Sequence, residues 1–211
     1  ALWLAHMLTT IDENDPGAGV SFGRIDQYLL PYWQKSLAAG MERAFGKEIL
    51  RCFFLHCSRA HNAMARPDCQ GIAAECGQWF NLSGLGPDGK DMTNELTYVF
   101  LEVAEEMAFL PAPKPCVRLH ANSPGRLLDR LIDLLARSQG APLLLSFDER
   151  SMAGLFEEAR RADVAALLNE SNAFDYATVG CPGNVLCGND RSATTDCGLN
   201  FAKALELALG N

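Results

Sequence analysis

Residues 115–150 read PCVRLHANSPGRLLDRLIDLLARSQGAPLLLSFDER, and this stretch decides the fold class. Its apolar runs at 116–120 and 142–147 have the length of buried strands. Between them, residues 124–138 repeat leucine and isoleucine at three- and four-residue intervals, which predicts an amphipathic helix that ends at Gly140. A strand, a helix and a second strand in succession are typical of α/β proteins.

The same alternation continues on both sides of this stretch. Residues 96–107 carry apolar side chains at helical spacing, and Asp91 is expected to cap that helix. A helix is expected at 151–161, a strand at 176–179 and a further helix at 199–209. We therefore expect an α/β fold in which helices cover buried strands.

The N-terminal part is expected to be mainly helical. A helix up to about Thr10 is followed by a loop at 12–19, which is rich in Asp, Asn, Pro and Gly. A second helix is expected from Arg24. Residues 37–65 have near-helical apolar spacing that stops before Pro67, which predicts either one long helix or a broken pair.

The composition of the chain excludes several classes of protein. The 211 residues are 48% hydrophobic and 21% charged, which is typical of a packed globule and excludes disordered and collagen-like structure. A net charge of −8 argues against binding to nucleic acid. Acidic and basic residues interrupt each apolar run before it could span a bilayer. Without an initiator Met or a signal peptide, the chain is expected to be a cytoplasmic fragment.

The 8 cysteines are expected to be reduced thiols, although their even number also allows four disulfides. Cys52, His56, Cys57 and His61 look like a set of metal ligands. At about 100° per residue, however, Cys57 and His61 lie about 140° and 180° around a helix from Cys52. Four such ligands cannot converge on one tetrahedral metal, so we expect packing or surface roles and no bound metal.

Polar residues follow the expected strands at His120, Asp148 and Glu149, where α/β sheets usually assemble their sites. Each of them can equally cap a loop. The segment at 176–184 is more informative, because an apolar strand leads Cys181 into a tight turn of glycine and proline. Composition alone favours an unreactive buried cysteine at this position.

Four motifs occur along the chain in a specific order. They are SFGRIDQYLLPY at 21–32, PDGKDMTNEL at 87–96, VRLH at 117–120 and VGC at 179–181. Together they resemble the large domain of the glycyl radical enzymes, the pyruvate formate-lyase superfamily, and the resemblance covers essentially the whole chain. It implies a ten-stranded α/β barrel built from two five-stranded halves, with a finger loop that carries a reactive cysteine into its centre.

The resemblance also implies that the reactive cysteine and the radical-bearing glycine belong to two different domains. Residues 1–211 are expected to be a partial barrel domain that carries the cysteine loop, and the C-terminal glycine radical domain is absent from them. Cys181 is implied to become a thiyl radical. Ser21 matches a substrate-binding serine, although it could also cap the loop before Gly23, and His120 is a second pocket candidate at a strand end.

The implied partners follow from the same family. A radical S-adenosylmethionine activating enzyme with an iron-sulfur cluster would install the glycyl radical, and the enzyme would need no bound organic cofactor of its own. The full-length protein is expected to be an anaerobic, cytosolic homodimer that acts on a small organic acid. The radical chemistry requires a closed site, because a sulfur radical must meet its substrate before it meets water or oxygen.

The downstream runs GNDRSAT at 188–194 and NFAKALEL at 200–207 look most like the arylacetate decarboxylases of the superfamily, such as hydroxyphenylacetate decarboxylase. Gly183 departs from the pattern, because decarboxylases and dehydratases usually have glutamate there as an acid/base group. Radical addition to fumarate, which forms an arylsuccinate, is therefore an alternative reaction. A dehydratase is a weaker alternative, and a catalytically inactive structural relative is the non-enzymatic one.

Overall fold

The computed structural model describes residues 21–63, 78–110, 112–140, 142–179, 183–188 and 201–209. Four parallel strands form its main sheet, in the order β1-β2-β3-β4. They are β1 (Ser21–Arg24), β2 (Trp79–Ser83), β3 (Lys114–Leu119) and β4 (Leu144–Phe147). Two further strands, β5 (Tyr176–Val179) and β6 (Gly183–Leu186), form an antiparallel pair.

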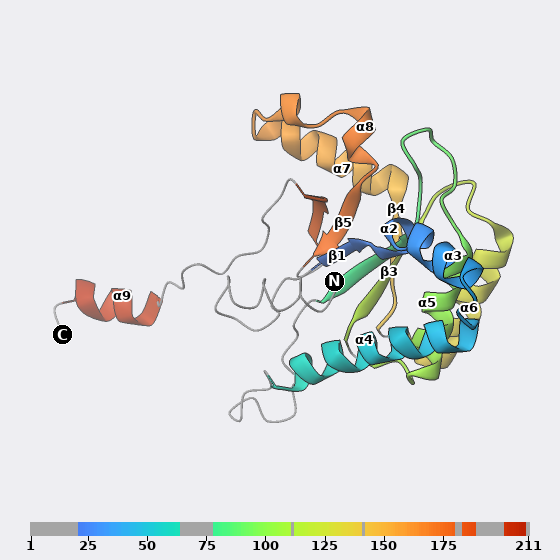
Figure 1. Ribbon diagram of the computed structural model, residues 1–211. Coiled ribbons are helices and arrows are strands. Elements are labelled where there is room, and N and C mark those ends of the chain that lie inside the picture. The colour runs from blue at the N-terminus through green and yellow to red at the C-terminus, as the bar shows by residue number, and fades with distance from the viewer. Residues whose placement is uncertain are drawn as a thin grey trace.

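Helices lie between the strands of the sheet in sequence and also follow its last strand. They are α2 (Ile25–Tyr28), α3 (Leu30–Ala38), α4 (Arg43–Ala63), α5 (Glu95–Glu106), α6 (Gly125–Ser138), α7 (Asp148–Arg161), α8 (Glu170–Ala173) and α9 (Phe201–Ala208), with a 3-10 turn at Ala165–Leu167. Figure 1 shows α4, α5 and α6 on one side of the sheet and β5 on the other. A helical crossover of this kind is the usual way to connect parallel strands.

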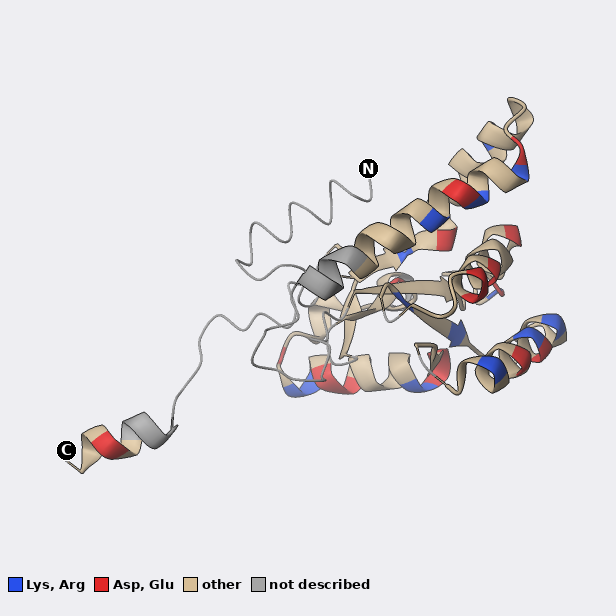
Figure 2. Ribbon diagram, turned by 90° about the horizontal axis from the view of Figure 1, so that it is seen from below, with Lys and Arg blue, Asp and Glu red and all other residues tan. Residues whose placement is uncertain are grey.

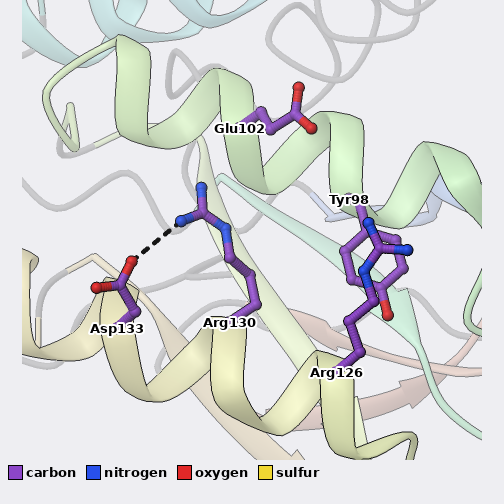
Figure 3. A pocket seen from close by; sticks show the side chains of 5 residues that line it. All are labelled: Tyr98, Glu102, Arg126, Arg130 and Asp133. Atoms are coloured by element: carbon purple, nitrogen blue, oxygen red, sulfur yellow. Dashed lines mark hydrogen bonds and ion pairs between the residues drawn. The ribbon is translucent and has the colours of Figure 1, made fainter.

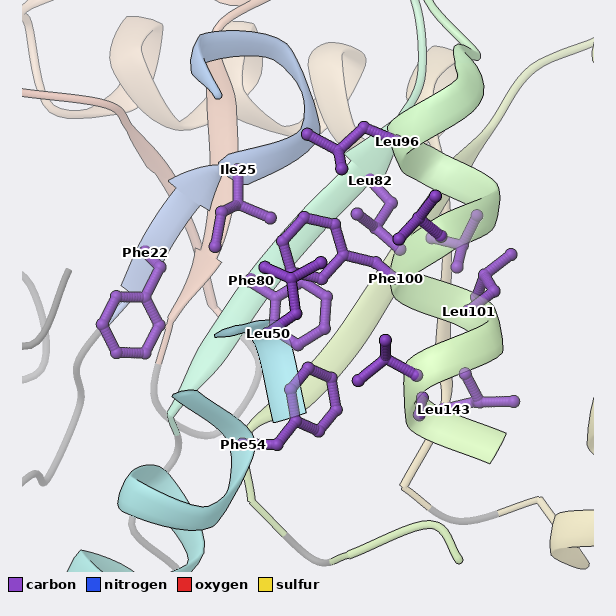
Figure 4. Close-up of a cluster of buried hydrophobic side chains, with 14 of the residues drawn as sticks. Phe22, Ile25, Leu50, Phe54, Phe80, Leu82, Leu96, Phe100, Leu101 and Leu143 are labelled. Carbon is purple, nitrogen blue, oxygen red and sulfur yellow. The ribbon is translucent and has the colours of Figure 1, made fainter. Parts of the chain in front are cut away.

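The core lies between the sheet and the helices α4, α5 and α6, as Figure 4 shows. Alternate residues of the strands, such as Phe80 and Leu82, point into it and are fully buried. The ring of Phe80 packs 5.3 Å from that of Phe100 on α5 and 5.7 Å from that of Phe54 on α4, measured between centroids. These aromatic contacts join the helices to the sheet.

Charged side chains lie mainly on the helices, whereas the strands are largely uncharged (Figure 2). Ion pairs such as Arg43 to Glu102, with 2.8 Å between Nη2 and Oε2, link α4 to α5 on the surface. Among the described residues, no helix is long and apolar enough to cross a membrane.

The residue that caps α5 is not Asp91, as the sequence led us to expect. Asn94 is the cap, because its Oδ1 accepts hydrogen bonds from the backbone N–H groups of Leu96 (2.9 Å) and Thr97 (3.2 Å). The hydroxyl of Thr97 in turn accepts a bond from the N–H of Asn94, which completes a capping box. Oδ1 of Asp91 instead accepts a bond from the hydroxyl of Thr93 in the same loop and lies 3.0 Å from Nε2 of His120.

The N-terminal half holds two strands where the sequence indicated none. The helix expected from Arg24 begins at Ile25, after the short strand β1, and β2 was not predicted. Within the range 37–65, α3 ends at Ala38, residues 39–42 are not helical, and α4 then runs unbroken from Arg43 to Ala63, so the long helix begins six residues later than expected. Cys57 on this helix is fully buried while Cys52 is exposed, in agreement with the helical geometry that argued against a metal site. Bound metal was not tested, and its absence stays a prediction.

Candidate active site

The pair of strands β5 and β6 is the element that bears on the predicted site. Val179 lies opposite Gly183, and Thr178 lies opposite Asn184. Residues 180–182, which connect the two strands in the sequence, include Cys181 and lie outside the described residues. The candidate site is therefore defined by how the sheet holds the described part of this hairpin.

The sheet face opposite the helices is polar and faces the hairpin. Asn81 of β2 accepts a hydrogen bond on Oδ1 from the backbone N–H of Thr178, at 2.9 Å. The hydroxyl of Thr178 donates to Sγ of Cys116 on β3, at 3.2 Å. Burial raises the pKa of Cys116 to about 11, so this sulfur stays a neutral thiol at physiological pH. One face of the sheet thus packs the core and the other holds the hairpin.

A buried ion pair holds the first residues of the hairpin. Arg118 on β3 bonds Asp148 through Nε to Oδ1 (2.9 Å) and through Nη2 to Oδ2 (3.0 Å), and neither side chain is exposed. The hydroxyl of Tyr176 donates to Oδ1 of Asp148 at 2.7 Å. Burial opposes the charge on Asp148, but the bonds from Arg118, Leu85 and Tyr176 outweigh it and lower the pKa of the carboxyl group.

Two arginines converge on the backbone just before β5. Arg118 donates from Nη1 to the carbonyl oxygens of Phe174 (2.9 Å) and Tyr176 (3.0 Å), and its guanidinium carbon lies 3.9 Å from the centroid of the Tyr176 ring. Arg24 donates to the same Phe174 oxygen at 3.1 Å. Gly84 makes room for the ion pair, since a Cβ there would lie 2.7 Å from Nε of Arg118.

The two predicted pocket residues lie at opposite ends of the sheet. Ser21 begins β1 and pairs with Trp79, which pairs in turn with Lys114 at the start of β3, whereas His120 follows the last residue of that strand. The Oγ of Ser21 accepts a bond from the N–H of Gly23 at 3.2 Å, which is the capping interaction considered as its alternative role. The structure does not bring Ser21 and His120 together.

The direction of β5 distinguishes these two candidates. Tyr176 contacts Arg118 near the carboxyl end of β3, and Thr178 contacts Asn81 and Cys116 nearer the middle of the sheet. The strand β5 therefore runs toward the end of the sheet where Ser21 lies. Among the described residues, the end of β5 at Val179 therefore points toward the end of the sheet that holds Ser21 and away from the end that holds His120.

Both ring nitrogens of His120 are engaged by nearby loops. Nε2 lies 3.0 Å from Oδ1 of Asp91, and Nδ1 accepts a bond from the N–H of Asn122 at 3.3 Å. The hydrogen bonds assign the proton of a neutral ring to Nε2. The oxygen Oδ1 of Asp91 also accepts from the hydroxyl of Thr93 at 2.7 Å. His120 thus orders the loop that precedes α5.

Two clefts formed by described residues lie on the helical side of the sheet. The one drawn in Figure 3 lies between α5 and α6 and is lined by Tyr98, Glu102, Arg126, Arg130 and Asp133. Its charges are largely paired, as in the 3.2 Å contact of Arg130 with Asp133 and the stacking of Arg126 over Tyr98 at 4.5 Å. The helical layer separates this cleft from the hairpin, so it is not the candidate site.

Besides Asp148, Asp26 is a second buried carboxyl group, and it lies next to Ser83 at the carboxyl end of β2. Its Oδ2 accepts bonds from the N–H of Ser83 (2.7 Å) and the hydroxyl of Thr97 (2.5 Å), and its Oδ1 accepts one from the amide of Gln27 (2.9 Å). Burial outweighs these bonds and raises the pKa of Asp26 to about 6, from an ordinary value of 3.8.

This raised pKa predicts that acidification stabilises the fold through Asp26. The folded state binds the proton more tightly than the unfolded state, so the stabilisation is complete below pH 3.8 and is lost as the pH rises through about 6. The loss amounts to roughly 3 kcal/mol. Urea unfolding between pH 4 and pH 7 measures it, and Asp26→Asn should remove this component. An identical pH profile in the variant and the wild type would contradict the assignment.

This chain has a parallel sheet with helices on one face and the strands β5 and β6 on the other, and glycyl radical enzymes share this arrangement. A glycyl radical enzyme from Archaeoglobus fulgidus superposes with a TM-score of 0.70 at 27% identity, over 89% of this chain and 23% of that one. This similarity confirms the expected fold class, part of a ten-stranded α/β barrel. The pyruvate formate lyase-like family model matches residues 1–211, and the chain belongs to this family.

Characterised relatives carry out several reactions. An isethionate sulfite-lyase of Nitratidesulfovibrio vulgaris is 29% identical over 214 residues, which are 100% of this chain and 24% of the relative. A trans-4-hydroxy-L-proline dehydratase of Clostridioides difficile is 26% identical over 99% of this chain and 25% of its own length. The chain thus spans about a quarter of the length of these relatives.

The comparisons do not single out the decarboxylases that the sequence pattern favoured. An indoleacetate decarboxylase of Tractidigestivibacter scatoligenes also matches, at 28% identity over 99% of this chain and 23% of its own length. The sulfite-lyases and the dehydratases are the stronger matches, and the decarboxylase is a distant one. The motifs explain why lyases with different leaving groups match, because residues such as Arg24, Asn94 and Arg118 hold the hairpin or cap a helix. They identify the fold and not the leaving group.

Proposed function

We propose that the full-length protein is a glycyl radical lyase in which the thiol of Cys181 becomes the thiyl radical that attacks a small organic acid. The observation that carries this proposal is the hairpin, because its described strands are bonded to a buried polar sheet face and Cys181 lies in the sequence that connects them. A cysteine supported in this way is suited to chemistry that demands a fixed reacting atom.

In the proposed reaction the sulfur radical takes a hydrogen atom from the carbon next to the one that bears a sulfonate. One electron of the C–H bond pairs with the unpaired electron of sulfur to form S–H, and the other remains on the substrate carbon. The C–S bond then breaks homolytically, a C=C bond forms, and a sulfite radical anion departs. This anion takes the hydrogen atom from the Cys181 thiol, which gives bisulfite and restores the thiyl radical.

Gly183 is the reason to prefer a leaving group that needs no proton. A Cβ at this position would meet only the Val179 carbonyl oxygen within 4 Å, at 3.8 Å, so the described backbone leaves room for a side chain. Lack of space therefore does not explain why position 183 is glycine and not the glutamate that the family pattern has there. Loss of hydroxide requires proton donation, whereas sulfite departs in the step above without it. The 29% identity to a sulfite-lyase supports the same choice.

Decarboxylation of an arylacetate is the second candidate, supported by the GNDRSAT run and by the identity to an indoleacetate decarboxylase. Here the thiyl radical takes one electron from the bound carboxylate and becomes a thiolate, and the resulting carboxyl radical releases carbon dioxide as its C–C bond breaks. A proton converts the thiolate to the thiol, and the arylmethyl radical takes the hydrogen atom of that thiol, which restores the thiyl radical. Because Gly183 cannot donate this proton, another group would have to supply it.

The proposal implies partners outside residues 1–211. The radical would be stored on a glycine elsewhere in the full-length protein and installed by a radical S-adenosylmethionine activating enzyme, in an anaerobic cytoplasm. The active form would be a homodimer without a bound organic cofactor.

The test compares four substrates with one activated protein. The full-length protein, activated without oxygen, is offered isethionate, an arylacetate, trans-4-hydroxy-L-proline, and toluene with fumarate. We expect sulfite from isethionate. Carbon dioxide with the decarboxylated arene would select the second candidate. Dehydrated hydroxyproline or an arylsuccinate would contradict both, and a protein that holds the glycyl radical but converts no substrate would favour the inactive relative.

A further inference from the structure

Asn81 occupies an unusual place in the sheet, because a fully buried amide lies in the middle of a strand whose core-facing neighbours are Phe80 and Leu82. Its side chain points to the hairpin face and bonds two polar groups of Thr178, the backbone N–H and the hydroxyl. Oδ1 accepts from the backbone N–H of Thr178 at 2.9 Å, and Nδ2 donates to the hydroxyl oxygen of the same residue at 3.4 Å. Because both polar atoms of this buried amide bond the same residue, the contact depends on which residue of β5 lies opposite Asn81.

The side chain of Asn81 bonds the backbone of β5 where a neighbouring strand would otherwise do so. Thr178 pairs with Asn184 of β6 on one side of β5, and the amide of Asn81 bonds its backbone on the other side. The hairpin is thus joined to the sheet by a side chain at this level and not by a strand ladder. A shift of β5 by one residue would place Ala177 or Val179 opposite Asn81 and turn the hydroxyl of Thr178 away.

The position of this contact along the hairpin separates it from the arginine contacts. Arg24 and Arg118 bind the carbonyl oxygens of Phe174 and Tyr176, where β5 begins. Asn81 binds Thr178, three residues before Cys181 in the sequence. Loss of the Asn81 contact would leave the beginning of β5 attached while the end nearest Cys181 is released.

We propose that Asn81 is a positioning residue. It fixes how far β5 extends along the sheet face opposite the helices, and thereby where the thiol of Cys181 meets the substrate. This inference rests on the proposed function of Cys181. Asn81 acts through Thr178, which lies three residues before Cys181 in the sequence. A misplacement of about 1 Å at a reacting atom can slow catalysis about 100-fold.

The test uses the activated full-length protein with whichever substrate it turns over. For Asn81→Ala we expect kcat to fall by about 100-fold, because the reacting sulfur is misplaced. KM should stay within about threefold, since the substrate-binding groups are intact. The yield of glycyl radical in the electron paramagnetic resonance spectrum should be unchanged. Thr178→Ser is the matched control, because it keeps both atoms that bond Asn81, and its kcat should stay near that of the wild type.

A second variant covers the case in which Asn81→Ala does not fold. Thr178→Val keeps the backbone bond to Asn81 but removes the hydroxyl that bonds Asn81 and Cys116. We expect a smaller loss of kcat and faster alkylation of Cys181 by iodoacetamide in the unactivated protein. Wild-type kcat and alkylation rate in this variant would overturn the proposal.

The outcomes for Cys181 and Asn81 are separable. If Cys181→Ser still turns over substrate, the proposed function fails, whatever the Asn81 variants do. If Cys181→Ser is inactive but Asn81→Ala keeps the wild-type kcat, only the positioning role fails. If the melting temperature, the radical yield and kcat of Asn81→Ala all fall together, the positioning role is also overturned, because that pattern indicates a structural role for Asn81.

Discussion

Replacing Cys181 with serine is expected to abolish turnover by the activated full-length protein, to the background rate without enzyme. The hydroxyl O–H bond is stronger than the thiol S–H bond, so a glycyl radical cannot pass its unpaired electron to serine. The substitution changes one atom and keeps the size of the side chain. The measurements are product formation without oxygen and the glycyl radical signal, which should persist in the variant because its storage does not need the thiol.

Cys187→Ser is the matched control for this prediction. Cys187 directly follows β6, so both cysteines belong to the same hairpin segment. Burial raises the pKa of Cys187 to about 11, which keeps its sulfur in the thiol form. We expect this variant to retain activity. Inactivity of Cys187→Ser together with activity of Cys181→Ser would transfer the radical role to the second cysteine.

The sequence predicted the strand, helix and strand around residues 115–150 because their signals are local. The helix α6 occupies Gly125–Ser138, within one residue of the expected start, since its leucine stripe alone defines the buried face. The strand β4 covers Leu144–Phe147 of the expected 142–147. The helix α7 begins at Asp148, three residues before the expected position, because the strand leads directly into it.

The strands β1 and β2 escaped prediction because each is short and has one polar face. In β2 the sequence WFNLS places Asn81 and Ser83 on the hairpin side, so the segment lacks the continuous apolar run of a doubly buried strand. In β1, glycine and serine have low strand propensity, and the strand exists through its pairing with residues more than fifty positions away. Such pairing leaves no local signal.

The site was predictable in part. The resemblance implied Cys181, whose role stays a prediction, and strand-end position identified Asp148 as a candidate without assigning its partner. Arg118 gave no signal as a contact of Asp148, because the two residues are 30 positions apart and meet only through the pairing of β3 with β4. The anchoring role of Asn81 was likewise hidden, since its partner Thr178 lies 97 positions away.

Arg118→Met is expected to destabilise the fold by about 3–5 kcal/mol, because removal of one partner leaves the buried charge of the other uncompensated. Asp148 is fully buried and loses two bonds from the guanidinium group, and the carbonyl oxygens of Phe174 and Tyr176 lose their donor. Methionine approximates the length of the lost side chain, so the cavity is small. Urea unfolding at pH 7 measures the change.

The pH dependence of Arg118→Met tests the cause of this loss. In the wild type, Asp148 has a lowered pKa, so the pair stabilises the fold above pH 3.8 and the stabilisation is lost on further acidification. Without Arg118, burial dominates and the pKa of Asp148 rises above its unfolded value. Because Asp26 stabilises both proteins on acidification, the test is the difference: the variant should gain more stability than the wild type as the pH falls from 7 to 5. The double variant Arg118→Met with Asp148→Leu removes both charges and should be more stable at pH 7 than the single variant. Equal stability of the two variants would show that the lost carbonyl contacts, and not the stranded carboxylate, account for the effect.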